Sequence, residues 1–559
     1  MSDAATPQLL AACLDELKKL PGAQNCATSA DGLTLSADFT GAHPWSLEIR
    51  VDPQRVNLPE VYALNADRPL AHVSYHKKVC ISDEQGVSLD TENYPAVVAH
   101  ATTMALDVLN NAVTLAHAGD HAALFDEFEG YWQGLPGLQV AGLAQELDDT
   151  PRLVQVAVEN AGKRRRPMAY RELGQSGRPW AGTAQFLYQK AAYLPLSAPL
   201  MPPAPGAAID AASADQYFQA LSAEGHAVLA KLTGAKRDAV YVHLLFSQPR
   251  GAGLRAVFGM SLWLKDKRPA AGLPVTPVSL MRCDPAYVRA RGGAAALMTA
   301  KRVAVLGCGS LGSEIADALV SCGVGALALV DPDVLTWDNV FRHALGAEAI
   351  GKYKADALAA RLKERYPGVQ ASPHRERAEQ WLLGSKTEFD AFVVAVGHPT
   401  RERVLAEQLA SGGRPVAAVT AWIEALGLGG HVVGSHPEIS GCLACLYCDA
   451  EGVAQLRPRT AFVAEGQRVT RNLTGCAGGF TPYSALHSRR TALLAAEVVL
   501  EYLQGKGSAT YRFWRGEGSA AQAENVATTS WFAAAANVSE QDAEKAAFKV
   551  RCARCSKLP

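Results

Sequence analysis

Residues with the chemistry of a nucleotide site are grouped between positions 301 and 355 of the 559-residue sequence. Gly307, Gly309 and Gly312 follow a short apolar run, and a second apolar run ends at Asp331 and Asp333. Glycines let the backbone come close to a phosphate, and a helix N-terminus offers free N–H groups and a positive dipole end. An acid at the tip of the second strand suits a ribose hydroxyl. These residues predict a nucleotide-binding site.

Polar residues that follow Asp333 indicate which reaction the nucleotide takes part in. Asn339 and Arg342 lie in an Asn-x-x-Arg pattern, and Lys354 lies in Gly-x-x-Lys-Ala. An NAD-dependent dehydrogenase needs an acid for the ribose but has no use for further cations there. An enzyme that handles a triphosphate does, because Arg and Lys neutralise the charge that develops as pyrophosphate leaves. The pattern therefore favours adenylation over hydride transfer.

Five of the twelve cysteines cluster in two short segments, 442–448 and 552–555. Cys442 and Cys445 form one Cys-x-x-Cys pair, and Cys552 and Cys555 form another. Four thiolates suit tetrahedral Zn²⁺ in a closed structural site, and a redox pair is the alternative. Cys448 remains as a structural thiol or as a replacement ligand.

Two other cysteines stand in settings that suit a nucleophile. Cys476 lies among glycines just before a predicted helix over residues 487–503. We predict an exposed loop there, in which a thiol near a helix N-terminus is pushed towards thiolate. Cys80 lies in the segment 72–81, which is rich in polar residues and histidine. The alternative for Cys80 is a core cysteine on an edge strand.

Local patterns predict the elements that must position the nucleotide residues. A strand at Arg302–Leu306, a helix over 313–321 and a strand at Ala326–Val330 make the mononucleotide half of a doubly wound sheet. Another buried strand is expected over 389–396, followed by Thr400 and Arg401. The chain is therefore expected to be an α/β protein in which residues 286–559 form a Rossmann-like domain.

Two further domains are predicted before this one. Residues 1–118 are predicted to be an α+β domain, with a helix, a meander of short strands and a long helix at 9–17, 33–39, 45–51, 61–64, 70–81 and 94–118. Residues 119–285 are predicted to be an α+β linker domain without recognisable chemistry. Its helical stretches and strands are expected at 122–132, 213–232, 239–246 and 254–264.

Composition limits the partners. The formal net charge is -1, and 48% of the residues are hydrophobic and 19% charged, as in ordinary globular proteins. A chain of this balance is not a general binder of nucleic acid or of membrane surfaces. No apolar run has the length of a transmembrane helix, and the N-terminus lacks a signal pattern. We expect a cytoplasmic protein with no nucleic-acid and no membrane partner.

The nucleotide motifs, in this order and spacing, resemble the ThiF-like, ubiquitin-activating adenylation family over residues 289–559. The resemblance implies ATP and Mg²⁺, a Zn²⁺ site at the paired knuckles, and an acyl-carrying cysteine at Cys476. It also implies a homodimer through the adenylation domain, in which Arg291 touches phosphates bound to the partner. Val396 stands in place of the family's Mg²⁺ aspartate, and the acids left open to compensate are Asp331, Asp333 and Asp390.

The segment around Cys80 resembles the active-site segment of ubiquitin-conjugating enzymes, in which a His-Pro-Asn motif precedes the catalytic cysteine. On this match His72 takes the place of the structural histidine and Cys80 that of the nucleophile. Val73 and Ser74 stand where the family has Pro and the Asn that stabilises the oxyanion. His76 or a backbone N–H is left to serve as the donor.

The domain order resembles the conjugating–activating fusion proteins of CBASS antiphage and related bacterial ubiquitination-like operons. The resemblance implies activation of the C-terminal carboxylate of a ubiquitin-like protein or of a cyclic-nucleotide synthase. The carboxylate would pass from Cys476 to Cys80 and then to a target lysine, in antiphage defence. A ThiF-like sulfur-carrier adenylyltransferase and a non-catalytic nucleotide-binding scaffold remain the alternatives.

Overall fold

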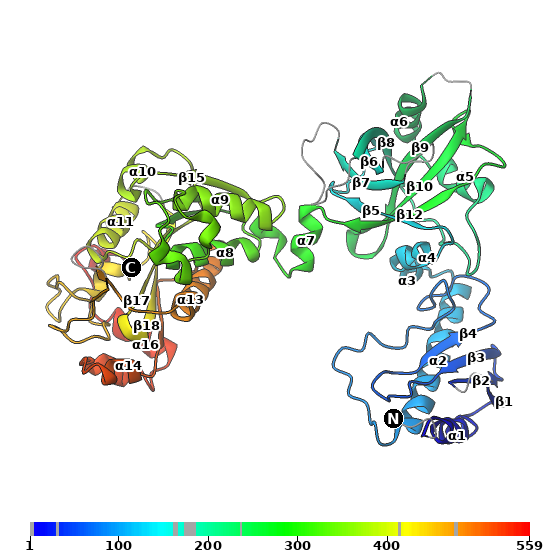
Figure 1. Ribbon diagram of the computed structural model, residues 1–559, viewed down its shortest axis with the longest axis horizontal. Helices are drawn as coiled ribbons and strands as arrows, with labels where there is room; N and C mark the ends of the chain where they lie inside the picture. Colours follow the sequence, from blue (N-terminus) through cyan, green and yellow to red (C-terminus); the bar gives the residue numbers. More distant parts are fainter. Residues whose placement is uncertain are drawn as a thin grey trace. The chain divides into compact units, whose positions relative to one another are not determined.

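The chain divides by its internal contacts into two compact units, Met1–Asp284 and Pro285–Pro559 (Figure 1). The computed structural model describes residues 5–29, 33–159, 166–172, 186–234, 238–411, 415–473 and 479–558. Within these ranges no helix has the length and apolar character needed to cross a membrane.

The first unit begins with a four-stranded antiparallel meander covered by two helices. The helices are α1 (Ala5–Leu17) and α2 (Tyr94–His117), and the strands are β1 (Ala23–Thr28), β2 (Thr34–Phe39), β3 (Trp45–Arg50) and β4 (Glu60–Ala63). Buried and more exposed residues alternate along β3, so one face of the sheet packs against the helices. Helix, meander and helix thus follow one another in the expected order.

Residues 70–81 do not form the predicted strand. Val73 and Val79 make only an isolated antiparallel bridge. His72 and Lys77 have φ angles of 62° and 67°, a left-handed conformation that interrupts a regular ladder. The segment is therefore a tight hairpin-like loop that folds back on itself, and the prediction of a continuous strand was wrong.

The rest of the first unit is built around a closed ring of strands. Its members, in the order in which they pair, are β10 (Arg255–Lys265), β12 (Thr276–Arg282), β5 (Gln139–Leu143), β7 (Pro167–Glu172), β6 (Arg152–Glu159), β8 (Phe186–Pro195) and β9 (Val240–Pro249). The ring closes because β9 pairs with β10 along most of the length of both strands. The short β11 (Arg268–Pro269) pairs with one end of β10.

Side chains alternate between the two sides of this barrel wall. Val156, Tyr193 and Leu245 belong to a core made of strand residues alone, which is the barrel interior. Phe258 and its neighbours on the outer side pack against four helices, which are α3 (Ala122–Asp126), α4 (Phe128–Gln133), α5 (Ala211–Gln219) and α6 (Ala223–Thr233). The predicted helix over 122–132 is thus broken at Glu127, and the one over 213–232 is broken before Ser222, which caps α6.

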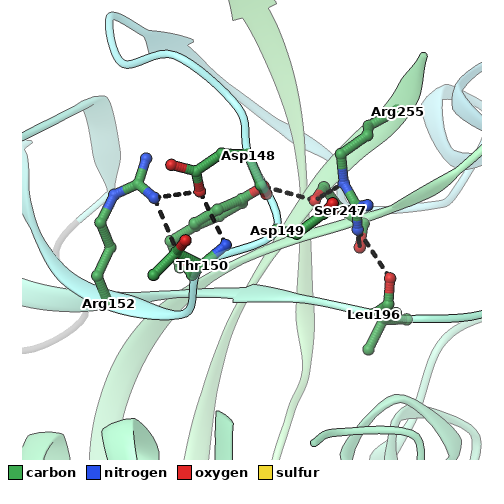
Figure 2. Close-up of polar contacts among 8 residues, drawn as sticks. Asp148, Asp149, Thr150, Arg152, Leu196, Ser247 and Arg255 are labelled. Carbon is green, nitrogen blue, oxygen red and sulfur yellow. Dashed lines mark hydrogen bonds and ion pairs between the residues drawn. The ribbon is translucent and has the colours of Figure 1, made fainter. Parts of the chain in front are cut away.

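A polar cluster that extends from the surface to the buried Ser247 ties the loop before β6 to the barrel (Figure 2). Arg255 donates from Nε to the Ser247 hydroxyl at 2.7 Å and pairs with Asp149. The Tyr193 hydroxyl lies 2.7 Å from the same Ser247 oxygen and donates to the Asp148 carbonyl at 2.6 Å. Each buried polar group here has a partner, which is the condition for placing a charge below the surface without a large penalty.

The second unit is a seven-stranded sheet of the order β15-β14-β13-β16-β17-β18-β21. The strands are β13 (Arg302–Leu306), β14 (Ala326–Val330), β15 (Gln370–His374), β16 (Ala391–Val394), β17 (Ala417–Ile423), β18 (Gly429–Ser435) and β21 (Thr510–Arg515). The first five in the sheet are parallel, and β18 and β21 are antiparallel to their neighbours. This is the Rossmann-type order, so the predicted fold class is confirmed.

Helices cover both faces of this sheet (Figure 1). One face packs against α8 (Ser310–Ser321), α9 (Lys354–Arg365) and α13 (Ala485–Leu503). The other packs against α10 (Ala378–Gly384) and α11 (Pro399–Ser411). The inner parallel strands have neighbours on both faces and are almost entirely buried, as in Val303 and Val393, whereas the edge strand β15 is largely exposed.

Candidate functional site

The glycine loop lies at the switch point of the sheet, between the carboxyl ends of β13 and β16. Gly307 has a φ of 94°, and a Cβ there would lie 2.4 Å from the Ala395 carbonyl oxygen. A Cβ at Gly312 would lie 1.8 Å from the Gly307 carbonyl oxygen, so α8 can pack this closely only without a side chain. Gly309 caps α8, and a Cβ there meets no atom within 4 Å. An open turn at a helix N-terminus is the geometry that receives a phosphate.

The two acids after β14 differ in role. Asp331 is buried, and its carboxylate accepts the backbone N–H of Cys308 at 2.7 Å and of Asp333 at 2.8 Å. Burial raises the pKa of Asp331, although these hydrogen bonds oppose the effect. Asp331 therefore holds the glycine loop against the strand end, whereas the exposed Asp333 carboxylate is available to a ligand.

Lys354 is held beside the glycine loop by two contacts with Asp333. Its backbone N–H donates to the Asp333 carbonyl at 2.9 Å, and its ammonium lies 3.0 Å from the Asp333 carboxylate. A pocket of about 120 Å³ brings together most of the predicted nucleotide residues, and it is lined among others by Gly307, Gly309, Asp331, Asp333, Lys354, Val396 and Arg401. This pocket is the candidate nucleotide site.

Four predicted residues lie outside the lining of this pocket within the described part of the chain, and Gly312, which packs against Gly307, is one of them. Asn339 is engaged in the short helix η3 (Trp337–Arg342), where its Oδ1 accepts the Thr336 backbone N–H at 3.3 Å. The Arg342 guanidinium lies 5.1 Å from the centre of the Tyr483 ring. Arg291 is exposed at the end of α7 (Pro285–Arg291). Arg342 and Arg291 therefore remain predictions that depend on bound ligands or on a partner subunit.

No sequence motif assigned Arg401 or Glu402 to the site. Arg401 lines the nucleotide pocket and makes two bonds with Glu379, at 2.6 and 2.8 Å. Glu402 is buried just behind Val396 and accepts the Gly397 backbone N–H at 2.8 Å. Burial raises the pKa of Glu402 to about 7. The only available signal was their position directly after a buried strand, where ligand-binding residues of such sheets gather.

His343, which no sequence pattern assigned to the site, supports the glycine loop from behind. Its Nδ1 accepts the Leu345 backbone N–H at 3.0 Å, so the ring proton is assigned to Nε2, which lies 2.7 Å from the Cys308 carbonyl oxygen. Burial lowers the pKa of His343 to about 4, so the ring is neutral at physiological pH. His343 thus binds the Cys308 carbonyl, and Asp331 binds the Cys308 backbone N–H, so both backbone groups of this loop residue are held in place.

The acids left open as Mg²⁺ ligands are separated by the structure. Asp390 binds Lys301 at 3.0 Å and the Arg302 backbone N–H at 2.8 Å, at the amino end of β13 and thus at the far end of the strand from the glycine loop. Asp331 has both carboxylate oxygens engaged by N–H groups. Asp333 is the remaining acid of the three.

The four knuckle cysteines converge in the second unit. The ligand atoms of Cys442, Cys445, Cys552 and Cys555 all lie within 4.8 Å of one another. The backbone N–H groups of Gly441 and Cys552 point to the sulfurs of Cys555 and Cys445, each at 3.4 Å. Such donors are typical around thiolate ligands, so the donor set fits tetrahedral Zn²⁺.

Cys448 is not part of this cluster. Its thiol donates to the Ala444 carbonyl at 3.5 Å, and it is buried two residues beyond the end of α12 (Leu443–Leu446). A structural role fits this contact.

Cys80 is exposed in a pocket of about 710 Å³ in the first unit, which is also lined by His72, Ser74 and Glu127. The Ser74 hydroxyl accepts the Lys78 backbone N–H at 3.1 Å and so belongs to the tight turn of this segment. Among the described residues His76 does not line the pocket, and its ring packs against Tyr75 with 5.2 Å between ring centres. Cys476, the other predicted nucleophile, lies outside the described residues.

The strand order and the glycine turn after β13 together define a domain of the Rossmann type. Residues 289–528 match the ThiF family, so the second unit carries a ThiF-family domain.

Proteins similar to this chain include ubiquitin transferase-like proteins and an adenylyltransferase and sulfurtransferase. The "ATP-dependent ubiquitin transferase-like protein Cap2" of Pseudomonas aeruginosa is 31% identical over 253 residues, which cover 43% of this chain and 44% of that protein. Cap2 of Vibrio cholerae is 29% identical over 37% of this chain and 36% of its own length. "Adenylyltransferase and sulfurtransferase MOCS3" of Mus musculus is 30% identical over 27% of this chain and 32% of its own length. The chain thus aligns with less than half of each of these relatives.

Among solved structures, E. coli MccB with MccA-N7isoASN aligns with 40% of this chain and 63% of its own, at 18% identity and a TM-score of 0.31.

Proposed function

We propose that this protein activates the C-terminal carboxylate of another protein with ATP and conjugates it to an amine through thioesters on Cys476 and Cys80. One observation carries the proposal. A chain that matches the ThiF family also has an exposed cysteine, Cys80, in a separate pocket of about 710 Å³. A sulfur-transfer enzyme needs the ThiF-family domain but has no use for Cys80. The homology to Cap2 proteins supports the same proposal.

The nucleotide site has the groups that adenylation requires. A carboxylate oxygen attacks the α-phosphorus of ATP and pyrophosphate leaves, so negative charge grows on the departing oxygens. The amide groups around Gly309 bind phosphate, and Lys354 and Arg342 neutralise the growing charge. The exposed Asp333 carboxylate takes either a ribose hydroxyl or a Mg²⁺ ion carried on the triphosphate.

The cysteines keep the carboxylate activated after adenylation. A thiolate on Cys476 attacks the acyl-adenylate, an S–C bond forms and AMP leaves. The Cys80 thiolate then attacks the Cys476 thioester, and the acyl group moves to Cys80. Finally an amine, which the resemblance identifies as a lysine, displaces Cys80 and forms an amide. Each intermediate remains a better electrophile than the free carboxylate.

The proposed Zn²⁺ ion has a structural role. Cys442, Cys445, Cys552 and Cys555 would hold it, and the closed four-thiolate set leaves no open position for a substrate. The ion would join the segment after β18 to the C-terminal residues.

A homodimer through the ThiF-family domain is also part of the proposal. Trp337 and Phe341 on η3 are 69% and 96% exposed, and Leu486 and Leu493 on the adjoining α13 are 71% and 58% exposed. Exposed apolar side chains on touching elements are typical of interaction surfaces. In such a dimer Arg291 would reach the nucleotide of the partner subunit.

The second candidate function is a sulfur-carrier adenylyltransferase, which the similarity to MOCS3 favours. In that case Cys476 would handle sulfur, and Cys80 would carry no acyl group. The role in antiphage defence depends on the resemblance to CBASS fusion proteins and on the Cap2 homology.

Trapping tests the proposal and also identifies the substrate protein. The tagged Cys80→Ser variant, purified from its native cells, should carry a protein on the hydroxyl at position 80, because an ester resists thiols that cleave a thioester. Mass spectrometry of that peptide identifies the attached C-terminus. The double variant with Lys354→Ala should lack the adduct. Absence of any adduct in the single variant, with ATP binding intact, would contradict the conjugating function and favour sulfur transfer.

A further inference from the structure

His72 and Cys80 lie opposite each other on the rim of the 710 Å³ pocket. Val73 and Val79 form an antiparallel bridge, and the Cys80 backbone N–H donates to the His72 carbonyl at 2.7 Å. Residues 72 and 80 are therefore the next pair across the same two segments. The two valines are buried, whereas His72 and Cys80 are exposed, so their side chains leave the opposite face together.

Glu127, at the junction of α3 and α4, holds His72 by two separate bonds. Its Oε1 lies 2.9 Å from His72 Nδ1, and its Oε2 accepts the His72 backbone N–H at 2.8 Å. A carboxylate only accepts hydrogen bonds, so the neutral ring carries its proton on Nδ1 and offers Nε2 as a proton acceptor. The same glutamate thus fixes the position of the ring and its tautomer.

The backbone of His72 has an unfavourable conformation that places its side chain beside Glu127. Its φ of 62° lies in the left-handed region, which is unfavourable for a non-glycine residue and persists only where the surroundings impose it. The element that imposes it here includes Tyr131, whose hydroxyl accepts the Leu70 backbone N–H at 3.1 Å and donates to the Leu70 carbonyl at 3.0 Å. Contacts from beyond α2 therefore shape the rim of the Cys80 pocket.

Other charged groups that line this pocket already have partners. Lys78 pairs with Glu60 at 2.7 Å, and Arg50 pairs with Glu48 at 2.9 Å. The Asp52 carboxylate accepts several backbone N–H groups of its own loop. Glu84, which is exposed at the rim, is the competing base that an experiment must separate from His72.

We propose that His72 is the general base for attack of the amine on the Cys80 thioester, with Glu127 as its positioning residue. This inference rests on the proposed acyl-carrier function of Cys80. The amine nitrogen forms a bond to the carbonyl carbon, and its proton moves to His72 Nε2. The C–S bond then breaks, and the same proton passes to the departing Cys80 sulfur. The products are an amide and a free thiol, so no further reactant is needed.

The test loads Cys80 chemically and therefore does not depend on the unidentified protein substrate. The full chain is acylated with the 2-mercaptoethanesulfonate thioester of acetylglycine, and the acyl group on the Cys80 peptide is followed by mass spectrometry. Discharge is then measured with n-butylamine, which loses a proton on attack, and with hydroxylamine, whose attack is much less dependent on a base. Circular dichroism melting checks that each variant is folded.

His72→Ala should slow discharge to n-butylamine by on the order of 10²-fold, the usual contribution of a general base. Discharge to hydroxylamine should change much less, and added imidazole should restore part of the n-butylamine rate. Glu127→Gln, which keeps the size of the side chain, should load normally but lose roughly tenfold in the n-butylamine rate, an order below the loss of the base itself. His76→Ala, the matched control in the same segment, should behave as the parent.

Four outcomes overturn the inference. If the His72→Ala variant discharges at the parental rate, His72 is not the general base. Equal slowing with both nucleophiles, without imidazole rescue, shows that His72 only shapes the loop. A loss found in Glu84→Gln instead assigns the base to Glu84. These three leave the acyl-carrier function intact, whereas a parent protein that cannot be acylated at Cys80 contradicts that function as well.

Discussion

At the scale of single residues, the candidate nucleotide site contains an ion pair between Lys354 and Asp333. The side chain of Lys354 is 11% exposed, and both its ammonium and its backbone N–H are bound to Asp333. A cation fixed in this way needs little reorganisation when charge develops on pyrophosphate. Its contribution should therefore appear in the rate of adenylation more than in nucleotide affinity.

We predict that Lys354→Ala lowers the rate of pyrophosphate–ATP exchange by about 10²-fold, as does loss of a single donor to a developing charge. The affinity for ATP, measured by calorimetry, should change by only a few-fold, because this cation acts mainly in the transition state. Lys352→Ala removes an exposed lysine two residues away and should leave both values unchanged. Exchange by Lys354→Ala at the parental rate would show that the assignment is wrong.

Glu402 makes stability depend on pH. Burial raises its pKa from 4.5 to about 7, so the folded protein keeps a proton that the unfolded chain loses above pH 4.5. The unfolding free energy should therefore fall as pH rises from 4.5 to about 7, by about 3 kcal/mol, and then stay level.

Glu402→Gln, which stays neutral, should match the parent near pH 4.5 and be the more stable protein above pH 7. Scanning calorimetry across this range measures the difference. Glu407→Gln, an exposed glutamate on the same helix, should follow the parental profile. An unchanged profile in Glu402→Gln would mean that its carboxylate is ionised in the folded state.

At the scale of elements, local patterns predicted the nucleotide half of the fold and long-range contacts decided the rest. Predicted and observed bounds agree for Arg302–Leu306 and Ala326–Val330, because strand, glycine turn and helix are encoded by adjacent residues. The loop at 70–81 was mistaken for a strand, since its left-handed His72 is imposed by a glutamate 55 positions away. Closure of the barrel by β9 and β10 likewise has no local signal.

The same contrast between local patterns and long-range contacts applies to the candidate sites. Sequence spacing located Asp333, Lys354 and the four cysteines that converge, since each is tied to a short pattern. Glu127 could not be found in this way, because its partner is defined only when α3 and α4 dock on the Cys80 segment. The supporting role of His343 was equally hidden, since a buried histidine that binds a loop carbonyl has no sequence signature.

The turn between β13 and α8 gives a pair of matched glycine variants. Gly309→Ala should fold as the parent, because its φ of -72° suits any residue and a Cβ meets no protein atom within 4 Å. It should still weaken ATP binding, since the new methyl group occupies the space that a phosphate needs. Gly312→Ala should instead lower the melting temperature, because its Cβ would overlap the Gly307 carbonyl. Equal ATP affinity in Gly309→Ala and the parent would place the phosphates elsewhere.

The paired knuckles should bind one Zn²⁺ per chain, as elemental analysis can establish. Cys552→Ser should release the ion and destabilise the C-terminal part of the second unit, because structural zinc contributes about 10–16 kcal/mol in small zinc domains at neutral pH. Cys448→Ser should retain both zinc and stability, since that thiol lies outside the cluster. Carefully purified parent protein without zinc would contradict the assignment.

At the scale of the whole molecule, the proposed relay joins two units that each have a pocket of their own. In the proposed reaction, adenylation would use the pocket of the second unit, and conjugation would use the pocket around Cys80 in the first. The acyl group must travel between them, so domain motion or a second subunit is part of the reaction. Serine variants can stop the relay at each step.

We predict that Cys476→Ser exchanges pyrophosphate but does not load Cys80, because the adenylate forms without its acceptor thiol. Cys80→Ser should load Cys476 and build no amide product that survives reducing agent. Gel analysis with and without thiol separates these states. Product restored by mixing the two variants means transfer between chains, and its absence means transfer within one. If Cys476→Ser conjugates as well as the parent does, Cys448 becomes the next candidate.

The closed barrel of the first unit has a consequence for the proposed activity, in which the protein would bind the C-terminal tail of another protein. Open sheet edges capture extended segments by strand addition, which leads to off-target binding and aggregation. In the barrel ring each strand has two neighbours, and the added strand β11 is only two residues long and ends in Pro269. The backbone of this region therefore offers little for a passing tail to pair with. Selectivity for a tail would then be decided by side chains at the reactive pockets, while the barrel remains inert towards substrates and towards other copies of itself.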